Sequence, residues 1–155
     1  KYTGGLLKLA PEHYSNKVLQ VMKKPDFPIY EKFFRLFTQL SREANRKQYI
    51  VPYIMVGHPG TDLQQALELA LYLCKNNIQL TQVQEFTPTP LSRSTMIYYT
   101  GKDEKGNVHY VPRGREIRLQ KALVQWFQPA NRKYVREALR LLKKEDLGRF
   151  FFRKK

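Results

Sequence analysis

The positions of apolar residues in the first part of the chain predict strands separated by helices. Residues 5–9 form a short apolar run that stops at Pro11, and residues 49–56 form a longer run rich in β-branched side chains. We expect a short buried strand at the first run and, at the second, a strand covered on both faces as in a parallel sheet. Pro52 lacks an amide hydrogen, so the second strand is expected to lie at an edge or to contain a bulge.

Two helices are expected between these strands, because apolar residues recur there at three- and four-residue steps. The first helix follows Ser15, whose hydroxyl can cap it, and stops at Pro25. The second begins near Pro28 and carries one apolar stripe opposite a basic face. The stripe consists of Ile29, Phe33, Leu36, Phe37, Leu40 and Ala44.

The middle of the chain repeats the strand and helix pattern. Residues 57–60 (GHPG) predict a turn, after which Thr61 is expected to cap a helix. Residues 80–86 alternate apolar and polar side chains and predict a third strand. A strand, a helix and a strand in this spacing indicate a right-handed parallel crossover. Residues 87–90 (TPTP) then carry the chain out of the sheet as an extended loop.

The last third of the chain has a different pattern. Residues 96–100 and 107–111 flank a charged, glycine-containing segment and predict a hairpin or an irregular pair of strands. Helices are expected over about residues 114–127 and 130–143, separated by Pro129. The end of the chain is expected to fray.

Charge divides the chain in a similar way. The 155 residues carry a formal net charge of +15, and residues 101–155 hold 16 basic against 6 acidic side chains. We therefore expect an α/β fold in two parts. Residues 1–95 hold about three parallel strands with crossover helices, and residues 96–155 hold the hairpin-like segment and a basic helical extension. The positive charge concentrated in residues 101–155 favours binding of nucleic acid or of an acidic partner. The plainer alternative is a solvated tail whose charges repel one another.

Composition limits the compartment and the kinds of site. No apolar run is long enough to span a bilayer, so no membrane partner is expected, and the N-terminus has no secretory signal pattern. The single cysteine, Cys74, excludes an internal disulfide and a multi-cysteine metal site built by this chain alone. A reducing cytoplasm is the expected compartment. Because the first residue is Lys1, we expect the sequence to come from a longer protein.

Polar residues gather where each predicted strand ends. Glu12 and His13 follow the first strand, His58 follows the second, and Gln84 and Phe86 close the third. In a parallel sheet with crossover helices, ligands bind at the carboxyl ends of the strands. These residues therefore predict a site for a polar small molecule at one rim of the sheet.

Each of these residues also has a plainer interpretation. Glu12 and His13 can satisfy backbone donors at the start of the helix that follows Ser15. His58 can serve the tight turn, and Glu85 can be a solvated charge. No phosphate loop, nucleophile elbow or zinc signature is present, so no local motif names a reaction.

Four segments in order resemble a known family over about residues 4–143. They are LKLAPEH, VLQVMKKP, YIVPYIMVGHPGT and VQEFTPTPLSRSTMIYYTG. Together they resemble the C-terminal half of radical S-adenosylmethionine proteins, specifically the uncharacterised YgiQ-like family. The resemblance implies a partial βα barrel whose first strands lie upstream of Lys1. It also implies that the three cysteines holding a four-iron four-sulfur cluster belong to that upstream part.

The resemblance implies cosubstrate contacts from the later strands. By position, Glu12 and His13 would contact the ribose of S-adenosylmethionine, Tyr53 to Val56 would run along the adenosine, and Gln84 or Phe86 would lie near the adenine. His58 stands where the superfamily usually has an aromatic residue. No cofactor is expected to bind tightly to this chain alone, which would be inactive without the rest of the enzyme, and the substrate is unknown.

Half a barrel also has consequences for partners. Half a barrel would expose an unpaired strand edge and the side chains meant to fill the barrel interior. We therefore expect the chain to bind the missing half of the same barrel or to self-associate. The alternative function is a basic binding module for nucleic acid or an acidic partner. Its expected basic face comprises Arg113, Arg115, Arg118, Lys121, Arg132, Lys133, Arg136 and Arg140.

Overall fold

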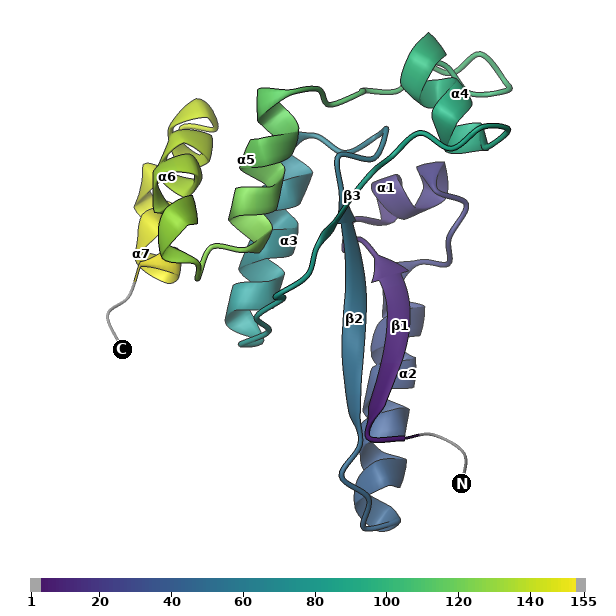
Figure 1. The fold of residues 1–155 in the computed structure, drawn as a ribbon, viewed down its shortest axis with the longest axis vertical. Coiled ribbons are helices and arrows are strands. Elements are labelled where there is room, and N and C mark those ends of the chain that lie inside the picture. Colours follow the sequence, from purple (N-terminus) through teal and green to yellow (C-terminus); the bar gives the residue numbers. More distant parts are fainter. Residues whose placement is uncertain (1–3, 153–155) are drawn as a thin grey trace.

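Three parallel strands organise the first part of the molecule, which is described for residues 4–152 by a computed structural model. The strands are β1 (Leu6–Glu12), β2 (Tyr49–Val56) and β3 (Gln84–Glu85), and they pair in the order β1-β2-β3 (Figure 1). Both pairings are parallel. The predicted α/β class and the parallel sheet are confirmed.

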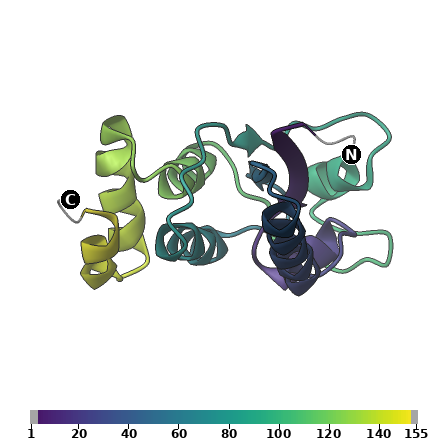
Figure 2. The ribbon, with the colours of Figure 1, turned by 90° about the horizontal axis from the view of Figure 1, so that it is seen from below.

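The helices between the strands cover one side of this sheet (Figure 2). They are α1 (Asn16–Val21), α2 (Phe27–Glu43) and α3 (Leu63–Lys75). Ile54 and Val56 of β2 belong to the buried core shared with α3, whereas Tyr53, which precedes Ile54, is 36% exposed. One face of the sheet is therefore packed, and the face that carries Tyr53 is more open.

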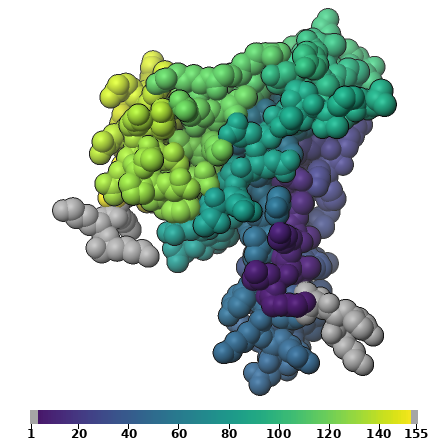
Figure 3. Space-filling view, viewed as in Figure 1, coloured from purple at the N-terminus to yellow at the C-terminus, as the bar shows by residue number. Residues whose placement is uncertain are grey.

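The apolar stripe of α2 is largely uncovered, although an apolar stripe opposite a basic face is typical of a helix that packs inward. Ile29, Leu36 and Leu40 are 51–60% exposed, and the residues of α2 that are buried are Phe27 and Ser41. In Figure 3 the lower part of β1, β2 and α2 projects away from the helical body. Residues 4–152 thus leave a solvent-facing apolar helix face.

Two details of the sheet differ from the prediction. β3 is only two residues long, because residues 80–83 do not enter the ladder. β2, which contains Pro52, is the central strand, and the irregularity lies in β1, where the pairing register shifts between Leu9 and Glu12. The missing donor of Pro52 thus lies next to a bulge in the neighbouring strand.

The predicted hairpin is wrong. Residues 96–100 belong to a helix, α4 (Arg93–Thr100), whose first turn is capped by the Ser92 hydroxyl accepting a hydrogen bond from the Thr95 amide at 3.3 Å. Gly101, with φ 70°, ends the helix. A single antiparallel bridge, between Lys102 and Val108, is what remains of strand pairing there. The aromatic and β-branched residues of this segment favour a strand, but the Ser92 cap and the burial of Ile97 stabilise a helix instead.

The C-terminal helices pack onto the sheet region rather than trailing from it. They are α5 (Arg115–Val124), η1 (Pro129–Asn131), α6 (Arg132–Leu141), η2 (Glu145–Leu147) and α7 (Gly148–Phe151). Leu119 and Leu123 of α5 share one core with Leu67 of α3 and Val56 of β2. The frayed end predicted for residues 149–155 is wrong as far as Phe151, which is buried in α7, and residues 153–155 lie outside the described part.

The helix boundaries elsewhere follow the predicted pattern closely, but two predicted caps are wrong: Ser15 makes no side-chain cap on α1, and the cap of α3 is not Thr61. Asp62, not Thr61, caps α3: its carboxylate accepts from the Gln65 amide, and the Gln65 side chain accepts from the Asp62 amide, both at 2.8 Å. This is a reciprocal capping box. No helix within residues 4–152 combines the length and the apolar character needed to cross a membrane.

Candidate functional site

The three strands end at one edge of the sheet, as predicted. Glu12 pairs with Ile54, and Gln84 pairs with Met55, so the carboxyl ends of neighbouring strands are in register. The segments that follow β1, β2 and β3 therefore open onto the same rim, which we call the strand-end site. Its core consists of Glu12, His13, His58 and Phe86.

Glu12 sits at the strand-end site in an unusual backbone conformation. The bulge that precedes it in β1 and its φ of 63° turn its side chain out of the regular strand direction. Its Oε1 accepts from the Lys24 ammonium at 3.3 Å, which also reaches the Ala10 carbonyl at 3.3 Å. Its Oε2 is buried and has no hydrogen-bond partner among residues 4–152. One carboxylate oxygen is thus left able to accept a hydrogen bond.

His13 is fully buried beside Glu12. Its Nδ1 accepts a hydrogen bond from the Ser15 amide at 3.0 Å, so Nε2 carries the ring hydrogen. That Nε2 has no partner within the described residues. Burial, and to a lesser degree the proximity of His58, lowers the pKa of His13 to about 3, so the ring is neutral at pH 7. The plainer interpretation is confirmed for Nδ1, which serves a backbone donor at the start of α1, while Ser15 makes no side-chain cap.

The turn after β2 is held by a residue from the far end of the chain. The Gln120 side chain on α5 accepts from the Gly57 amide at 2.9 Å and donates to the Thr61 carbonyl at 3.0 Å. Gly60 has a φ of 89°, and a β-carbon there would lie 2.9 Å from a methyl group of Val21 in α1. The turn is therefore held by hydrogen bonds to α5 on one side and by close packing against α1 on the other.

His58 is fixed in one tautomer within this turn. Its Nδ1 lies 2.6 Å from the Pro59 carbonyl, which can only accept, so Nδ1 carries the hydrogen. Its Nε2 lies 2.7 Å from the Ser94 hydroxyl and accepts from it. The ring of Phe86 packs edge-on against the imidazole with centroids 5.0 Å apart. Burial lowers the pKa of His58 to about 4, although the Pro59 hydrogen bond opposes the shift. The ring is therefore neutral at pH 7, and both of its nitrogens are hydrogen-bonded.

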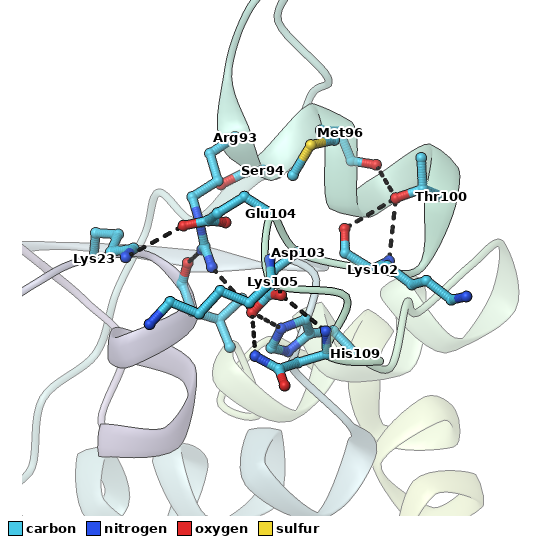
Figure 4. Close-up of polar contacts among 12 residues, drawn as sticks. Lys23, Arg93, Ser94, Met96, Thr100, Lys102, Asp103, Glu104, Lys105 and His109 are labelled. Atoms are coloured by element: carbon cyan, nitrogen blue, oxygen red, sulfur yellow. Dashed lines mark hydrogen bonds and ion pairs between the residues drawn. The ribbon is translucent and has the colours of Figure 1, made fainter.

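Arg93 positions Ser94 by tying α4 to its surroundings (Figure 4). The Arg93 guanidinium donates to the Val21 carbonyl and forms ion pairs with Glu104 at 2.6 Å and Asp103 at 3.5 Å. Asp103 is the centre of its loop and accepts from His109 at 3.1 Å. Hydrogen bonds from Asn107 and His109 hold the pKa of Asp103 well below its usual range. This network anchors α4 over the strand-end site.

Two predicted site residues lie outside this cluster. Tyr53 is on the open face of β2, with the Lys8 ammonium 5.9 Å from its ring centroid. Gln84 is exposed on β3. Cys74 on α3 donates to the Phe150 carbonyl at 3.2 Å, and no three His, Cys, Asp or Glu side chains within residues 4–152 are grouped closely enough to hold a metal ion.

Lys24, Ser94 and Gln120 contact the site, but the sequence did not predict them. Ser94 lies two positions after Ser92, which caps α4. Recognising Ser92 as a helix cap would have placed Ser94 in the first turn of a helix. Gln120 bonds to Gly57 across 63 positions, and no local pattern signals such a contact.

Comparison with known proteins gives two kinds of match. A family model described as a domain of unknown function, DUF3362, matches residues 81–150. A UPF0313 protein of Geobacter sulfurreducens is 46% identical over 150 residues, which is 96% of this chain and 25% of that protein. The UPF0313 protein YgiQ of Escherichia coli K12 is 41% identical over 153 residues, which is 94% of this chain and 21% of that protein. The chain spans a quarter or less of these relatives.

Proposed function

Because the chain belongs to the UPF0313 family, we propose that it forms the later strands of a radical S-adenosylmethionine βα barrel. In this proposal it supplies walls for the cosubstrate and for a substrate of unknown identity, and it is inactive without the rest of the enzyme. The observation that carries the proposal is the convergence of Glu12, His13, His58 and Phe86 at one rim of a parallel sheet.

The unsatisfied atoms at this rim fit part of the cosubstrate. The buried Oε2 of Glu12 is an acceptor suited to a ribose hydroxyl, and the Nε2–H of His13 is a buried donor. Phe86 offers a ring next to His58 on which an adenine can pack. Buried polar atoms without partners are uncommon, and two of them in adjacent residues at the strand ends favour a polar ligand there.

The arrangement of the sheet supports a barrel completed by other parts of the protein. Helices cover one face, whereas Tyr53 and Lys8 share the more open face. β1 has a free edge within the described residues, and the apolar stripe of α2 next to it is exposed. Such edges and stripes are usually covered. The chain matches only 21–25% of the relatives named above, so the rest of a longer protein is the occupant we propose.

The iron–sulfur cluster would have to be held elsewhere. Such a cluster is bound by several cysteine thiolates, and this sequence has one cysteine, Cys74, which lies on α3 against the Phe150 carbonyl. In the complete enzyme the cluster would supply the electron for reductive cleavage of S-adenosylmethionine. The residues of this chain would bind and orient the nucleoside and exclude water from it.

The first test is the complete coding sequence and the protein it encodes. We expect a C-x-x-x-C-x-x-C segment upstream of Lys1, a cluster visible by electron paramagnetic resonance after reduction, and release of 5′-deoxyadenosine from S-adenosylmethionine. Three cysteines missing from that region, or a complete protein that never binds iron, would remove the radical enzyme from consideration.

A second test separates the role of this chain from that of the cluster. In the complete protein, Glu12→Gln should weaken S-adenosylmethionine binding by about 10- to 100-fold, because a hydrogen bond to a charged group is worth about 1.5–3 kcal/mol. Isothermal titration calorimetry measures this directly, with the iron content unchanged. The matched control is Glu43→Gln, since Glu43 is exposed at the end of α2 and, within residues 4–152, its side chain bonds only to Gln39 on its own helix. Equal affinities of the two variants would contradict the role of Glu12.

A further inference from the structure

One face of the sheet is left without helices (Figure 2), and it carries a lysine. Lys8 in β1 is exposed, whereas its neighbours Leu7 and Leu9 are partly buried, so the Lys8 side chain points away from the helices. Lys8 pairs with Val51 of β2, and its ammonium lies 5.9 Å from the ring centroid of Tyr53, two residues further along that strand. The ammonium therefore lies beside the Tyr53 ring on the open face of the sheet.

The positive charge of Lys8 is not compensated by the described part of the chain. No carboxylate of residues 4–152 forms an ion pair with the Lys8 ammonium. The two acidic residues of the strands have cations of their own, since Glu12 pairs with Lys24 at 3.3 Å and Glu85 pairs with Lys121 at 2.7 Å. Within the described strands, the open face therefore carries an unpaired cation.

Enclosure of the open face would make an unpaired lysine unfavourable. In the barrel proposed above, the face of the sheet that carries Lys8 and Tyr53 becomes part of the interior, because the helices of such a barrel lie on its outside. Moving an ammonium from water into a protein interior is strongly unfavourable unless an anion pairs with it. The completed barrel therefore needs an anion close to Lys8.

The polar groups beside Lys8 favour a ligand as the source of this anion. Gln84 is exposed and pairs with Met55, which lies two residues after Tyr53 on the same face of β2. The ammonium, the phenol and the amide thus follow one another toward the strand-end site, and about 7 Å separate the levels of Tyr53 and Gln84. The phenol and the amide can both donate hydrogen bonds to ligand oxygens. An ion pair with a fixed carboxylate would use Lys8 alone.

We propose that Lys8, together with Tyr53 and Gln84, binds an anionic group of the substrate, a carboxylate or a phosphate. The substrate is then a small acid that enters at the strand-end site and places its anionic group about 7 Å deeper, at the level of Tyr53. This inference rests on the barrel proposed above and adds to it the chemical class of the substrate. It is carried by the unpaired ammonium and by the polar groups that lead to it from the rim.

The first test measures how added anions protect the Lys8 amine in the complete protein. Trace acetylation with N-acetoxysuccinimide, followed by mass spectrometry, gives a reaction rate for each lysine. Inorganic phosphate or succinate should slow the acetylation of Lys8 about threefold relative to sodium chloride of equal ionic strength, as for a site that is two-thirds occupied. Lys32, which is exposed on α2, is the internal control and should react at the same rate in all three salts. Equal rates for Lys8 in the three salts would overturn the proposal.

A neutral side chain of similar length separates a bound ligand from a fixed carboxylate. Without added anions, Lys8→Met in the complete protein should melt no lower than wild type, because it removes an uncompensated ammonium. If a carboxylate from the rest of the protein pairs with Lys8, the same change leaves that carboxylate alone and lowers the melting temperature by several degrees. Such a loss would overturn the proposal. Lys32→Met is the matched control and should melt within about 1 °C of wild type, as expected for an exposed position.

A third arm separates the substrate from the cosubstrate, which has a carboxylate of its own. S-adenosylmethionine added to the cluster-containing protein should leave the acetylation rate of Lys8 unchanged. Protection by S-adenosylmethionine as strong as that by phosphate would assign Lys8 to the cosubstrate and overturn the substrate assignment. Protection by phosphate or succinate in a protein that never binds S-adenosylmethionine would contradict the radical enzyme but support the anion site. Binding of S-adenosylmethionine without protection by either anion would leave the enzyme in place and refute the anion site.

Discussion

Replacement of Gln120 by methionine tests how the two ends of the chain are joined. Met has nearly the volume of Gln but makes no amide hydrogen bonds, so the Gly57 amide and the Thr61 carbonyl lose their partner at 2.9 and 3.0 Å. Gln120 is fully buried, so solvent does not replace these bonds. A buried backbone group without a partner costs about 1–3 kcal/mol, so the variant should lose about 2–4 kcal/mol of the free energy of unfolding.

The measurement is urea unfolding and thermal melting of wild type and Gln120→Met, with Gln39→Met as control. Gln39 lies on the exposed side of α2, and among the described residues its side chain bonds only to Glu43, so its loss should change stability by no more than about 0.5 kcal/mol. At about 2–4 °C per kcal/mol for a chain of this size, Gln120→Met should melt about 10 °C below the control. Hydrogen exchange of the Gly57 amide should accelerate at the same time. If the two variants melt within about 2 °C of each other, the turn after β2 is not held by α5.

Two further predictions concern the strand-end site. Gly60→Ala should lower the free energy of unfolding in urea by about 1–3 kcal/mol, because the φ of Gly60 is 89° and the new methyl group would lie 2.9 Å from Val21. The control is Gly106→Ala, which should cost less because Gly106 has a similar φ of 82° but no atom within 4 Å of the new methyl group. Equal losses of stability in the two variants would rule out the steric contact with Val21. Burial lowers the pKa of His13 to about 3 and that of His58 to about 4, from an ordinary value of 6.5. Between pH 6.5 and pH 4 the unfolded chain therefore binds more protons at these two histidines than the folded chain does. The free energy of unfolding should therefore fall as pH drops from 6.5 toward 4, by about 1.4 kcal/mol per pH unit for each histidine, and His13→Asn should remove about half of that slope. An unchanged slope in His13→Asn would show that His13 is not held neutral.

The sequence predicted the elements whose residues repeat at a regular period. β2 has the predicted bounds, residues 49–56, and α3, α5 and α6 lie where apolar positions recur at helical steps. Such periodicity is local, since one buried face fixes either a two-residue or a 3.6-residue repeat. The parallel crossover also followed from the order of elements, so the common rim of Glu12, His58 and Phe86 could be predicted from sequence.

The tertiary structure decided what depends on distant neighbours. α4 is a helix although its aromatic and β-branched residues favour a strand, because Ser92 caps it and Ile97 is buried against the rest of the molecule. The apolar stripe of α2 is exposed because no segment within residues 4–152 covers it, and no pattern within the helix contains that information.

The same distinction holds for the candidate site. Sequence placed Glu12, His13, His58 and Phe86 at strand ends, but the hydrogen bond to the Nε2 of His58 comes from Ser94, which is 36 positions away. The turn that carries His58 is held by Gln120, on a helix that follows the whole sheet. Local sequence determines which backbone conformations are favourable, whereas hydrogen bonds between distant segments form only once the packing of helices on the sheet has brought them together.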